Sequence, residues 1–138
     1  MTVIPYLTFP GTCRDAMTFY ADVFGTKIDM MMEAKDTPGF DAPAGKENHV
    51  AHCSMHVAEG EIYASDNFAE QSAPMAACSI MVSLPSNVAS RDAFEKLAIG
   101  GAVEMPFGAT FWSGGFGTLT DKFGTKWMIS SLEEPAKG

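Results

Sequence analysis

The chain has 138 residues, with nine Lys and Arg against 17 Asp and Glu, and a formal net charge of -8. A chain of this length buries about 68% of its unfolded surface, enough for one sound hydrophobic core. The acidic balance argues against a protein that follows nucleic-acid phosphates with a basic stripe. No apolar run reaches the ~20 residues that span a bilayer. We therefore expect neither a nucleic-acid partner nor a membrane partner.

The cysteines and the first residues bear on the compartment. Cys13, Cys53 and Cys78 are odd in number and lack metal-type spacing, which is typical of reduced thiols. No cationic flank followed by an apolar stretch is visible at the start of the sequence. These features predict a cytoplasmic protein.

The first half of the chain predicts one helix among four strands. In chain order we expect a strand over 3–9, a helix over 13–24, and strands over 27–33, 49–58 and 61–66. Pro10-Gly11 ends the first strand, and Gly25 supplies the stop signal of the helix. The last two strands are expected to form a hairpin at Glu59-Gly60, after a loop over 34–48.

The second half repeats this order after a linker over 67–76. We expect a strand over 77–84, a helix over 86–99, and strands over 102–105, 111–120 and 125–131. Arg91-Asp92-Ala93 echoes Arg14-Asp15-Ala16, and Pro85 closes its strand as Pro10 does. The hairpins are expected to match as well, with Gly60 and Tyr63 corresponding to Gly124 and Trp127.

The repeat predicts two βαβββ modules, over 1–66 and 77–131, in one domain. Neither module could cover its sheet alone. We therefore expect an α+β fold in which the paired modules form one curved mixed sheet, with the helices outside and a concave cup for a ligand.

Several motifs, in this order, are similar to those of the vicinal oxygen chelate superfamily. They are residues 5–9, 13–17, 19–20 and 23–25, then His52, residues 64–66 and 111–112, and residues 120–124 with Trp127. The chain resembles the glyoxalase I and bleomycin-resistance fold, and within it the PhnB-like branch. The resemblance implies a homodimer with a small organic ligand in each cup.

Proteins of this branch often carry the label 3-demethylubiquinone 3-methyltransferase-like. The sequence gives that activity no support, because no Gly-rich turn follows a predicted strand and opens a helix. Gly114, Gly115 and Gly117 lie instead within a strand pattern, where glycine marks a bulge or a close approach of the backbone.

The resemblance also indicates where a metal would be bound. Metal-dependent members place His, Gln or Glu at one position on each of four strands. Those positions fall near Ile4, Ala64, Ser79 and Met128, and none of these side chains is a good donor. A divalent ion needs three or four convergent N, O or S donors. No metal site of this kind, and no cofactor, is predicted.

A group of polar residues is expected to line the cup. His52, Ser54 and His56 alternate on one face of their strand, while apolar residues between them take the other face. The apolar set should pack beneath the helices, which turns both histidines into the cup. Asp66 joins them if the hairpin has an odd count or a bulge, whereas a strict two-residue turn places it opposite.

Further lining residues follow from the same reasoning. Tyr6 and Thr8 share the cup face of the first strand, and Trp112 and Met128 belong to the last two strands. An aromatic wall with a few hydroxyls suits a small planar or amphipathic ligand. The expected ligand-binding residues are Tyr6, Thr8, His52, Ser54, His56, Asp66, Trp112 and Met128.

Three functions remain open. The first is a protein that binds a small organic molecule in its cup, with or without a reaction. The second is a lyase, isomerase or dioxygenase with a relocated metal at His52 and His56. The third is a resistance protein that sequesters a cationic drug, which the acidic charge would attract.

Overall fold

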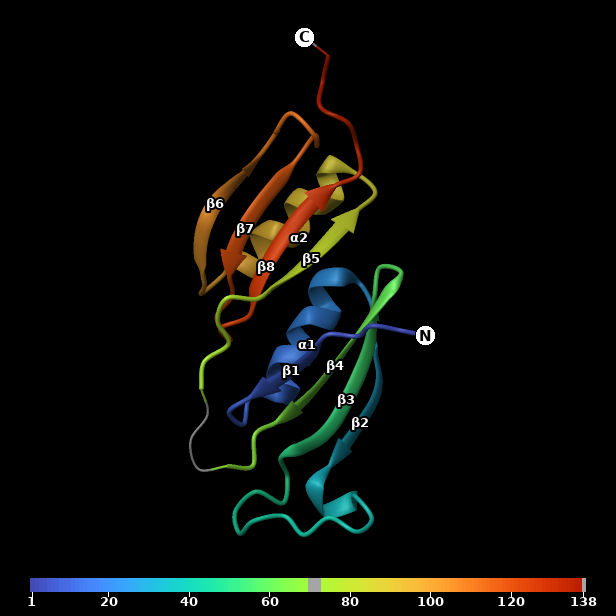
Figure 1. The fold of residues 1–138 in the computed structure, drawn as a ribbon, viewed down its shortest axis with the longest axis vertical. Coiled ribbons are helices and arrows are strands. Elements are labelled where there is room, and N and C mark those ends of the chain that lie inside the picture. The colour runs from blue at the N-terminus through green and yellow to red at the C-terminus, as the bar shows by residue number, and fades with distance from the viewer. Residues whose placement is uncertain (70–72, 138) are drawn as a thin grey trace. The chain divides into compact units, whose positions relative to one another are not determined.

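The computed structural model describes residues 1–69 and 73–137 and divides into two compact units, drawn in Figure 1. Unit 1 is Met1–Ala73 and unit 2 is Pro74–Gly138. The linker expected over 67–76 includes residues 70–72, which lie outside the described part of the chain. Each unit is a βαβββ module.

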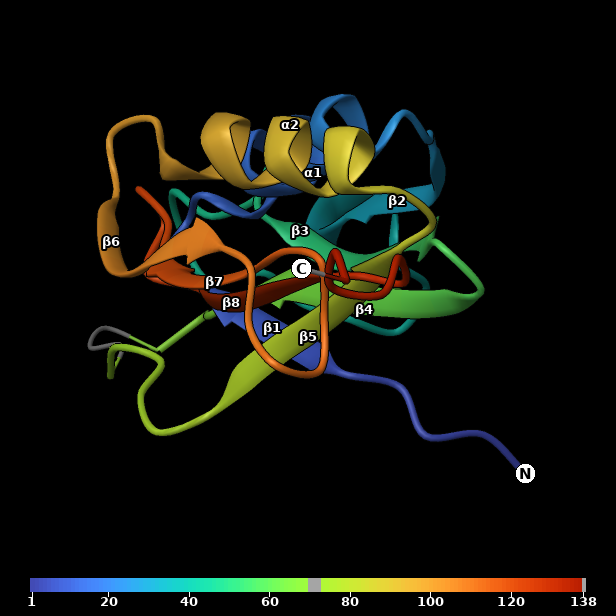
Figure 2. The same ribbon diagram turned by 90° about the horizontal axis from the view of Figure 1, so that it is seen from above.

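Unit 1 is a four-stranded sheet with one helix against it (Figure 2). Its elements are β1 (Tyr6–Phe9), α1 (Cys13–Phe24), β2 (Ile28–Glu33), a short 3-10 helix η1 (Ala34–Asp36), β3 (Val50–Val57) and β4 (Gly60–Asp66). The strand order is β1-β4-β3-β2, with β1 parallel to β4 and the other pairs antiparallel. Within residues 1–69, η1 is the one element that the sequence did not predict, and it lies at the start of the expected loop.

The core of unit 1 lies between α1 and the sheet. Met17 and Tyr20 on α1 and Phe9 on β1 are fully buried there. Burying a large apolar side chain stabilises a fold by roughly 1.5–3 kcal/mol. At its C-terminal end α1 stops at Gly25, whose φ of 63° is the left-handed conformation that glycine adopts without strain.

Unit 2 repeats the arrangement. Its elements are β5 (Ser79–Leu84), α2 (Asn87–Ala98), β6 (Ala102–Gly108), β7 (Phe116–Thr120) and β8 (Lys126–Ser131). The strand order is β5-β8-β7-β6, with β5 parallel to β8. Leu97 of α2 and Trp127 and Ile129 of β8 are fully buried in the core. No helix in the described ranges is long and apolar enough to cross a membrane.

The predicted α+β class and the paired βαβββ modules are confirmed. Strand pairing among the described residues gives one four-stranded mixed sheet in each unit. In both sheets the first strand of the module, β1 or β5, lies at one edge beside the last strand, β4 or β8, and β2 or β6 ends the other edge.

The seventh strand is shorter than the sequence predicted. It begins at Phe116 rather than at residue 111. The preceding residues form a loop because Ser113, only 1% exposed, donates its hydroxyl to the carbonyls of Gly115 and Ser131 at 2.8 and 2.7 Å. A turn from Thr110 to Ser113 closes the loop through a backbone hydrogen bond of 3.0 Å. Trp112 therefore lies in a loop and not on a strand.

The expected match between the two hairpins is wrong by one residue. Parallel pairing aligns Tyr6 with Tyr63 in unit 1 and Met81 with Met128 in unit 2. Counted from Phe9 and Leu84, the strand-ending residues before the two prolines, Tyr63 corresponds to Met128 and not to Trp127. The cause is loop length: Val57 pairs with Gly60 across a two-residue turn, whereas Thr120 pairs with Lys126 across a longer loop.

Candidate ligand-binding site

The sheet of unit 1 has one face under α1 and one face away from it, which we call the open face. Leu7 and Phe9 of β1 and Cys53 and Met55 of β3 are buried under α1. Alternation along each strand turns the residues between them to the open face. The polar and aromatic residues on the open face are Tyr6, Thr8, His52, Ser54, His56, Glu61, Tyr63 and Ser65.

Three rings on the open face contact one another, and we call Tyr6, His52 and Tyr63 the aromatic trio. The Tyr6 hydroxyl lies 3.1 Å from His52 Nδ1. Tyr63 stands nearly perpendicular to both other rings, with centroids 6.4 Å from Tyr6 and 5.0 Å from His52. Edge-to-face contacts of this kind contribute about 0.5–1.5 kcal/mol beyond area burial. The trio is therefore a preformed surface with a polar centre.

Four of the residues predicted to bind a ligand lie in the aromatic trio or next to it. Tyr6 and His52 belong to the trio itself, Ser54 pairs in register with Tyr63, and Thr8 pairs with Ser65. Sequence reasoning missed Tyr63 and Ser65. A strict two-residue turn at residues 58–59 would have predicted both of them. Such a turn places the odd-numbered residues of β4 opposite the even-numbered residues of β3, and therefore on the same face as His52 and Ser54.

His56 lies at the other end of the open face, in a carboxylate cluster. Its Nδ1 is 2.6 Å from Asp29 Oδ2, and its Nε2 is 3.4 Å from Glu61 Oε1. The hydrogen bond to Asp29 and the charges of Asp29 and Glu61 raise the pKa of His56 above its ordinary value of 6.5. The two carboxylates therefore stabilise the protonated ring relative to that of an unpartnered histidine.

A relocated metal at His52 and His56 does not fit this geometry. Four residues along a strand separate their Cα atoms by about 13 Å, because each residue rises about 3.3 Å. Their ring nitrogens also face different partners, Tyr6 for His52 and Asp29 for His56. Within the described ranges, no three His, Cys, Asp or Glu side chains are grouped so that they could hold a metal ion.

The inherited metal positions do not fit a divalent ion either. Ala64 is fully buried, on the side of the sheet that faces α1. Met128 and Ser79 lie on β8 and β5 and offer a thioether and a hydroxyl, while Ile4 precedes β1. A methyl, an alkyl chain, an uncharged hydroxyl and a thioether lack the anionic and imidazole donors that such an ion requires.

Asp66 is the predicted residue that the fold places elsewhere. It is 4% exposed and lies under α1, where its Oδ1 accepts the backbone N–H of Cys13 at 2.9 Å. Its Oδ2 accepts the backbone N–H of Val50 at 2.8 Å. The strict two-residue turn fixes which residues of β4 point to each face of the sheet. It places Asp66 on the face under α1, opposite to the face of His52 and His56. It satisfies the first amide of α1, which the side chain of Thr12 leaves unbonded.

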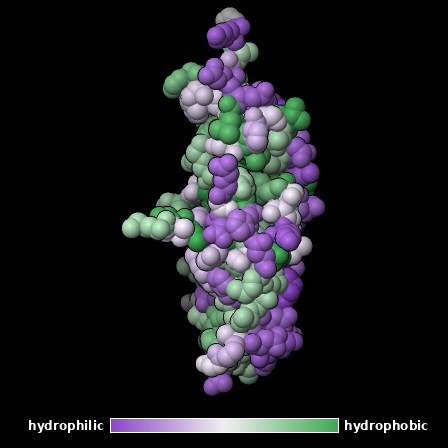
Figure 3. Space-filling view, turned by 90° about the vertical axis from the view of Figure 1, so that its right-hand side faces the viewer, coloured by the Kyte–Doolittle hydropathy of each residue, from purple (hydrophilic) through white to green (hydrophobic). Residues whose placement is uncertain are grey.

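The two remaining predicted residues belong to unit 2. Met128 pairs with Met81 and Thr118 on the face of its sheet away from α2. Trp112 is 51% exposed and contacts the rings of Phe111 and Phe116 at centroid distances of 4.8 and 5.4 Å. Figure 3 shows one side of the molecule, on which hydrophobic residues in green lie among hydrophilic residues in purple. The register therefore places Met81, Met128 and Phe116 in unit 2 at the positions where unit 1 has the aromatic trio.

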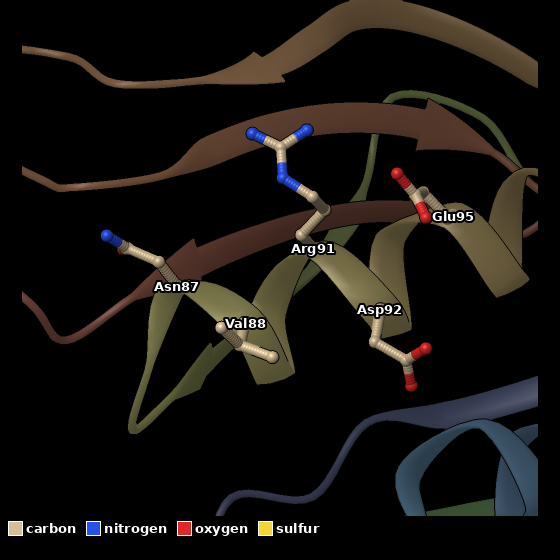
Figure 4. Close-up of a pocket in the computed structure, with 5 residues that line it drawn as sticks. All are labelled: Asn87, Val88, Arg91, Asp92 and Glu95. Atoms are coloured by element: carbon tan, nitrogen blue, oxygen red, sulfur yellow. The ribbon is translucent and has the colours of Figure 1, made fainter.

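A separate hollow of about 310 Å³ lies along the outer side of α2 (Figure 4). It is lined by Asn87, Val88, Arg91, Asp92 and Glu95. Arg91 and Asp92 point away from each other, and the Arg91 guanidinium lies 4.9 Å from the centre of the Phe107 ring. None of the residues predicted from the sequence lines this hollow.

The charge of His56 gives a testable prediction. We expect its pKa, measured by NMR titration, to lie above 6.5 and to fall in Asp29→Asn, which removes the hydrogen-bonded carboxylate. The folded state then binds the proton more tightly than the unfolded chain does. The stabilisation is thus complete below pH 6.5 and is lost as the pH rises through the raised value. A wild-type pKa at or below that of Asp29→Asn would contradict this.

Comparisons with known proteins give the family and extend the fold assignment. Residues 1–130 match the family described as 3-demethylubiquinone-9 3-methyltransferase. Protein YjdN of Escherichia coli K12 is 30% identical over 144 residues, which cover 97% of each chain.

Solved structures support the same family and the same fold. Protein PA1353 of Pseudomonas aeruginosa is 34% identical with a TM-score of 0.88, over 97% of this chain and 99% of that one. A PhnB protein of Bacillus cereus is 27% identical with a TM-score of 0.81, over 96% and 100%. The fosfomycin resistance protein FosX of Listeria monocytogenes, at 9% identity, 94% and 91% coverage and a TM-score of 0.61, shares the fold. The chain therefore belongs to the 3-demethylubiquinone-9 3-methyltransferase family, a PhnB-like family with the glyoxalase-like fold.

Proposed function

We propose that this protein binds a small organic molecule on the open face of unit 1, with the aromatic trio as the anchor. The observation that carries the proposal is the preformed contact of Tyr6 with His52 and the perpendicular packing of Tyr63 against both. Small-molecule sites combine aromatic surface with a few fixed polar groups. The trio and the neighbouring hydroxyls of Thr8, Ser54 and Ser65 are such a combination.

Unit 2, taken by itself, has different side chains at the positions that correspond to the trio. Met81, Met128 and Phe116 occupy the positions that correspond to Tyr6, Tyr63 and His52, and Met81 is 55% exposed. Thioether side chains adapt to ligands of irregular shape. We infer that this surface of unit 2 favours an amphipathic ligand over a purely polar one.

We further propose that the protein acts as a homodimer in the cytoplasm. Phe111, 90% exposed, and Trp112, 51% exposed, are aromatic surface that a second copy would cover. All three cysteines are free. Light scattering on the full chain tests the dimer, and a monomer over a wide concentration range would contradict it.

The two alternative functions, a metal-dependent reaction and the sequestration of a cationic drug, differ in how much support they have. A metal-dependent reaction has little support, since the donors of His52 and His56 diverge. Sequestration of a cationic drug draws on the net charge of -8, but the carboxylates Asp29 and Glu61 on the open face are both engaged with His56. We therefore keep the binding of an uncharged or anionic organic molecule as the proposed function, and treat the cationic ligand as an outcome of the tests.

The experiment is a thermal-shift screen of small organic compounds, followed by calorimetry on each hit. We expect hits whose affinity falls about tenfold or more in His52→Ala, a loss of ~1.4 kcal/mol, because the polar centre of the trio is gone. His56→Ala is the matched control, since His56 lies on the same strand and face but pairs with the carboxylates of Asp29 and Glu61 rather than with the trio. Hits that bind His52→Ala as tightly as wild type, or a screen with no hits, would contradict the proposal.

A further inference from the structure

We propose that Tyr6 fixes the proton of His52 on Nε2, and that this N–H binds a carbonyl or carboxylate oxygen of the ligand. This inference rests on the proposed function, because it names the ligand group that the trio recognises. It starts from the 3.1 Å contact between the Tyr6 hydroxyl and His52 Nδ1.

The first step concerns the direction of that hydrogen bond. In a neutral imidazole one nitrogen carries the proton and the other accepts, and the partner of one nitrogen sets the state of the other. Within the described residues, His52 Nδ1 is the one hydrogen-bond partner of the Tyr6 hydroxyl. A phenol is a stronger donor than acceptor, so its O–H donates to Nδ1. The proton of the imidazole is then on Nε2.

The second step concerns what surrounds Nε2. No hydrogen-bond partner of Nε2 is found among the residues that the structure describes. Cys53 on β3 pairs with Ala64 on β4, so the next two residues along these antiparallel strands, His52 and Ser65, lie opposite each other. On the other side of β4, Ser65 pairs with Thr8 of β1. These two hydroxyls share the open face with the Nε2–H group and are further hydrogen-bond donors beside it. An oxygen acceptor therefore satisfies a group of donors that now depend on solvent.

The third step concerns charge. The carboxylates of this sheet have partners away from the trio. Asp29 and Glu61 contact His56, Glu33 pairs with Arg14 at 2.8 Å, and Asp66 lies on the face under α1. A cationic ligand group at the trio would face the Nε2–H donor and would have no carboxylate beside it to balance its positive charge. The same donor favours a neutral carbonyl or an anionic carboxylate.

The tautomer is measured first, by nitrogen-15 NMR on the full chain with labelled histidine. We expect Nε2 of His52 to show the protonated type of chemical shift and Nδ1 the unprotonated type. In Tyr6→Phe the preference should weaken, because the donor that fixes it is removed, whereas the ring contacts remain. The protonated type at Nδ1 in the wild type, or no change in Tyr6→Phe, would overturn the inference.

The ligand class is tested with three probes that share one phenyl ring: benzoate, benzamide and benzylamine. We expect benzoate and benzamide to shift the NMR signals of His52 and Tyr63, and benzylamine to leave them unchanged. Binding of benzylamine alone at the trio would overturn the oxygen-acceptor inference and leave the proposed function standing. If the Nε2–H tautomer is observed and none of the three probes reaches the trio, the ligand class is wrong, and the compound screen decides the proposed function separately.

Discussion

Replacing Asp66 by Ala is expected to lower the free energy of unfolding by about 3–5 kcal/mol, because two hydrogen bonds to a buried charged group are lost. The carboxylate accepts the backbone N–H groups of Cys13 and Val50 at 2.9 and 2.8 Å and is 4% exposed. Without it, the first amide of α1 and the first amide of β3 are left in the interior without an acceptor. Urea denaturation followed by circular dichroism measures the change.

Two variants make that measurement specific. Asp66→Asn keeps one oxygen acceptor but turns an NH₂ group toward the second amide, so we expect a loss between those of wild type and Asp66→Ala. Glu59→Ala removes an exposed carboxylate from the turn before β4 and should change stability by less than ~0.5 kcal/mol. A loss below about 1 kcal/mol in Asp66→Ala would show that solvent reaches the two amides and that the carboxylate is dispensable.

The elements of the fold were predictable where local signals decide them. Helix α1 has the predicted bounds, Cys13–Phe24, because apolar spacing and the Gly25 stop agree. The repeat was visible because each first strand ends at a proline. The start of β7 was not predictable, since it depends on the Ser113 hydroxyl reaching the carbonyl of Ser131, 18 residues away in sequence. Local patterns hold no information on such a contact.

The site was predictable only in part, for a related reason. The alternation of β3 placed His52 and Ser54 on the open face, as expected. The contact between Tyr6 and His52 joins residues 46 apart in sequence, on strands that are not neighbours. Strand β4 lies between them, which is why Tyr63 completes the trio. Strand order and turn length decide both facts, and neither can be read from residue periodicity.

Replacing Asp121 by Ala is the corresponding prediction for unit 2, with an expected loss of about 3–5 kcal/mol. The side chain is 4% exposed, and its Oδ1 accepts the backbone N–H groups of Phe123 and Thr125 at 2.8 and 3.1 Å. Its Oδ2 accepts the indole N–H of the fully buried Trp127 at 2.8 Å. The change therefore removes the acceptor that fixes the turn before β8 and breaks the hydrogen bond between Asp121 and the core indole.

Urea denaturation again measures the effect of Asp121→Ala, with Asp92→Ala as the control. Asp92 is exposed on α2, and its one ion pair, with Lys96 at 3.0 Å, is of a kind worth about 0.3–0.5 kcal/mol. Asp121→Asn separates charge from geometry, because it retains one acceptor for either the turn amides or the indole but not for both. If Asp121→Ala is no less stable than Asp92→Ala, the carboxylate does not hold the turn and the buried indole has another acceptor.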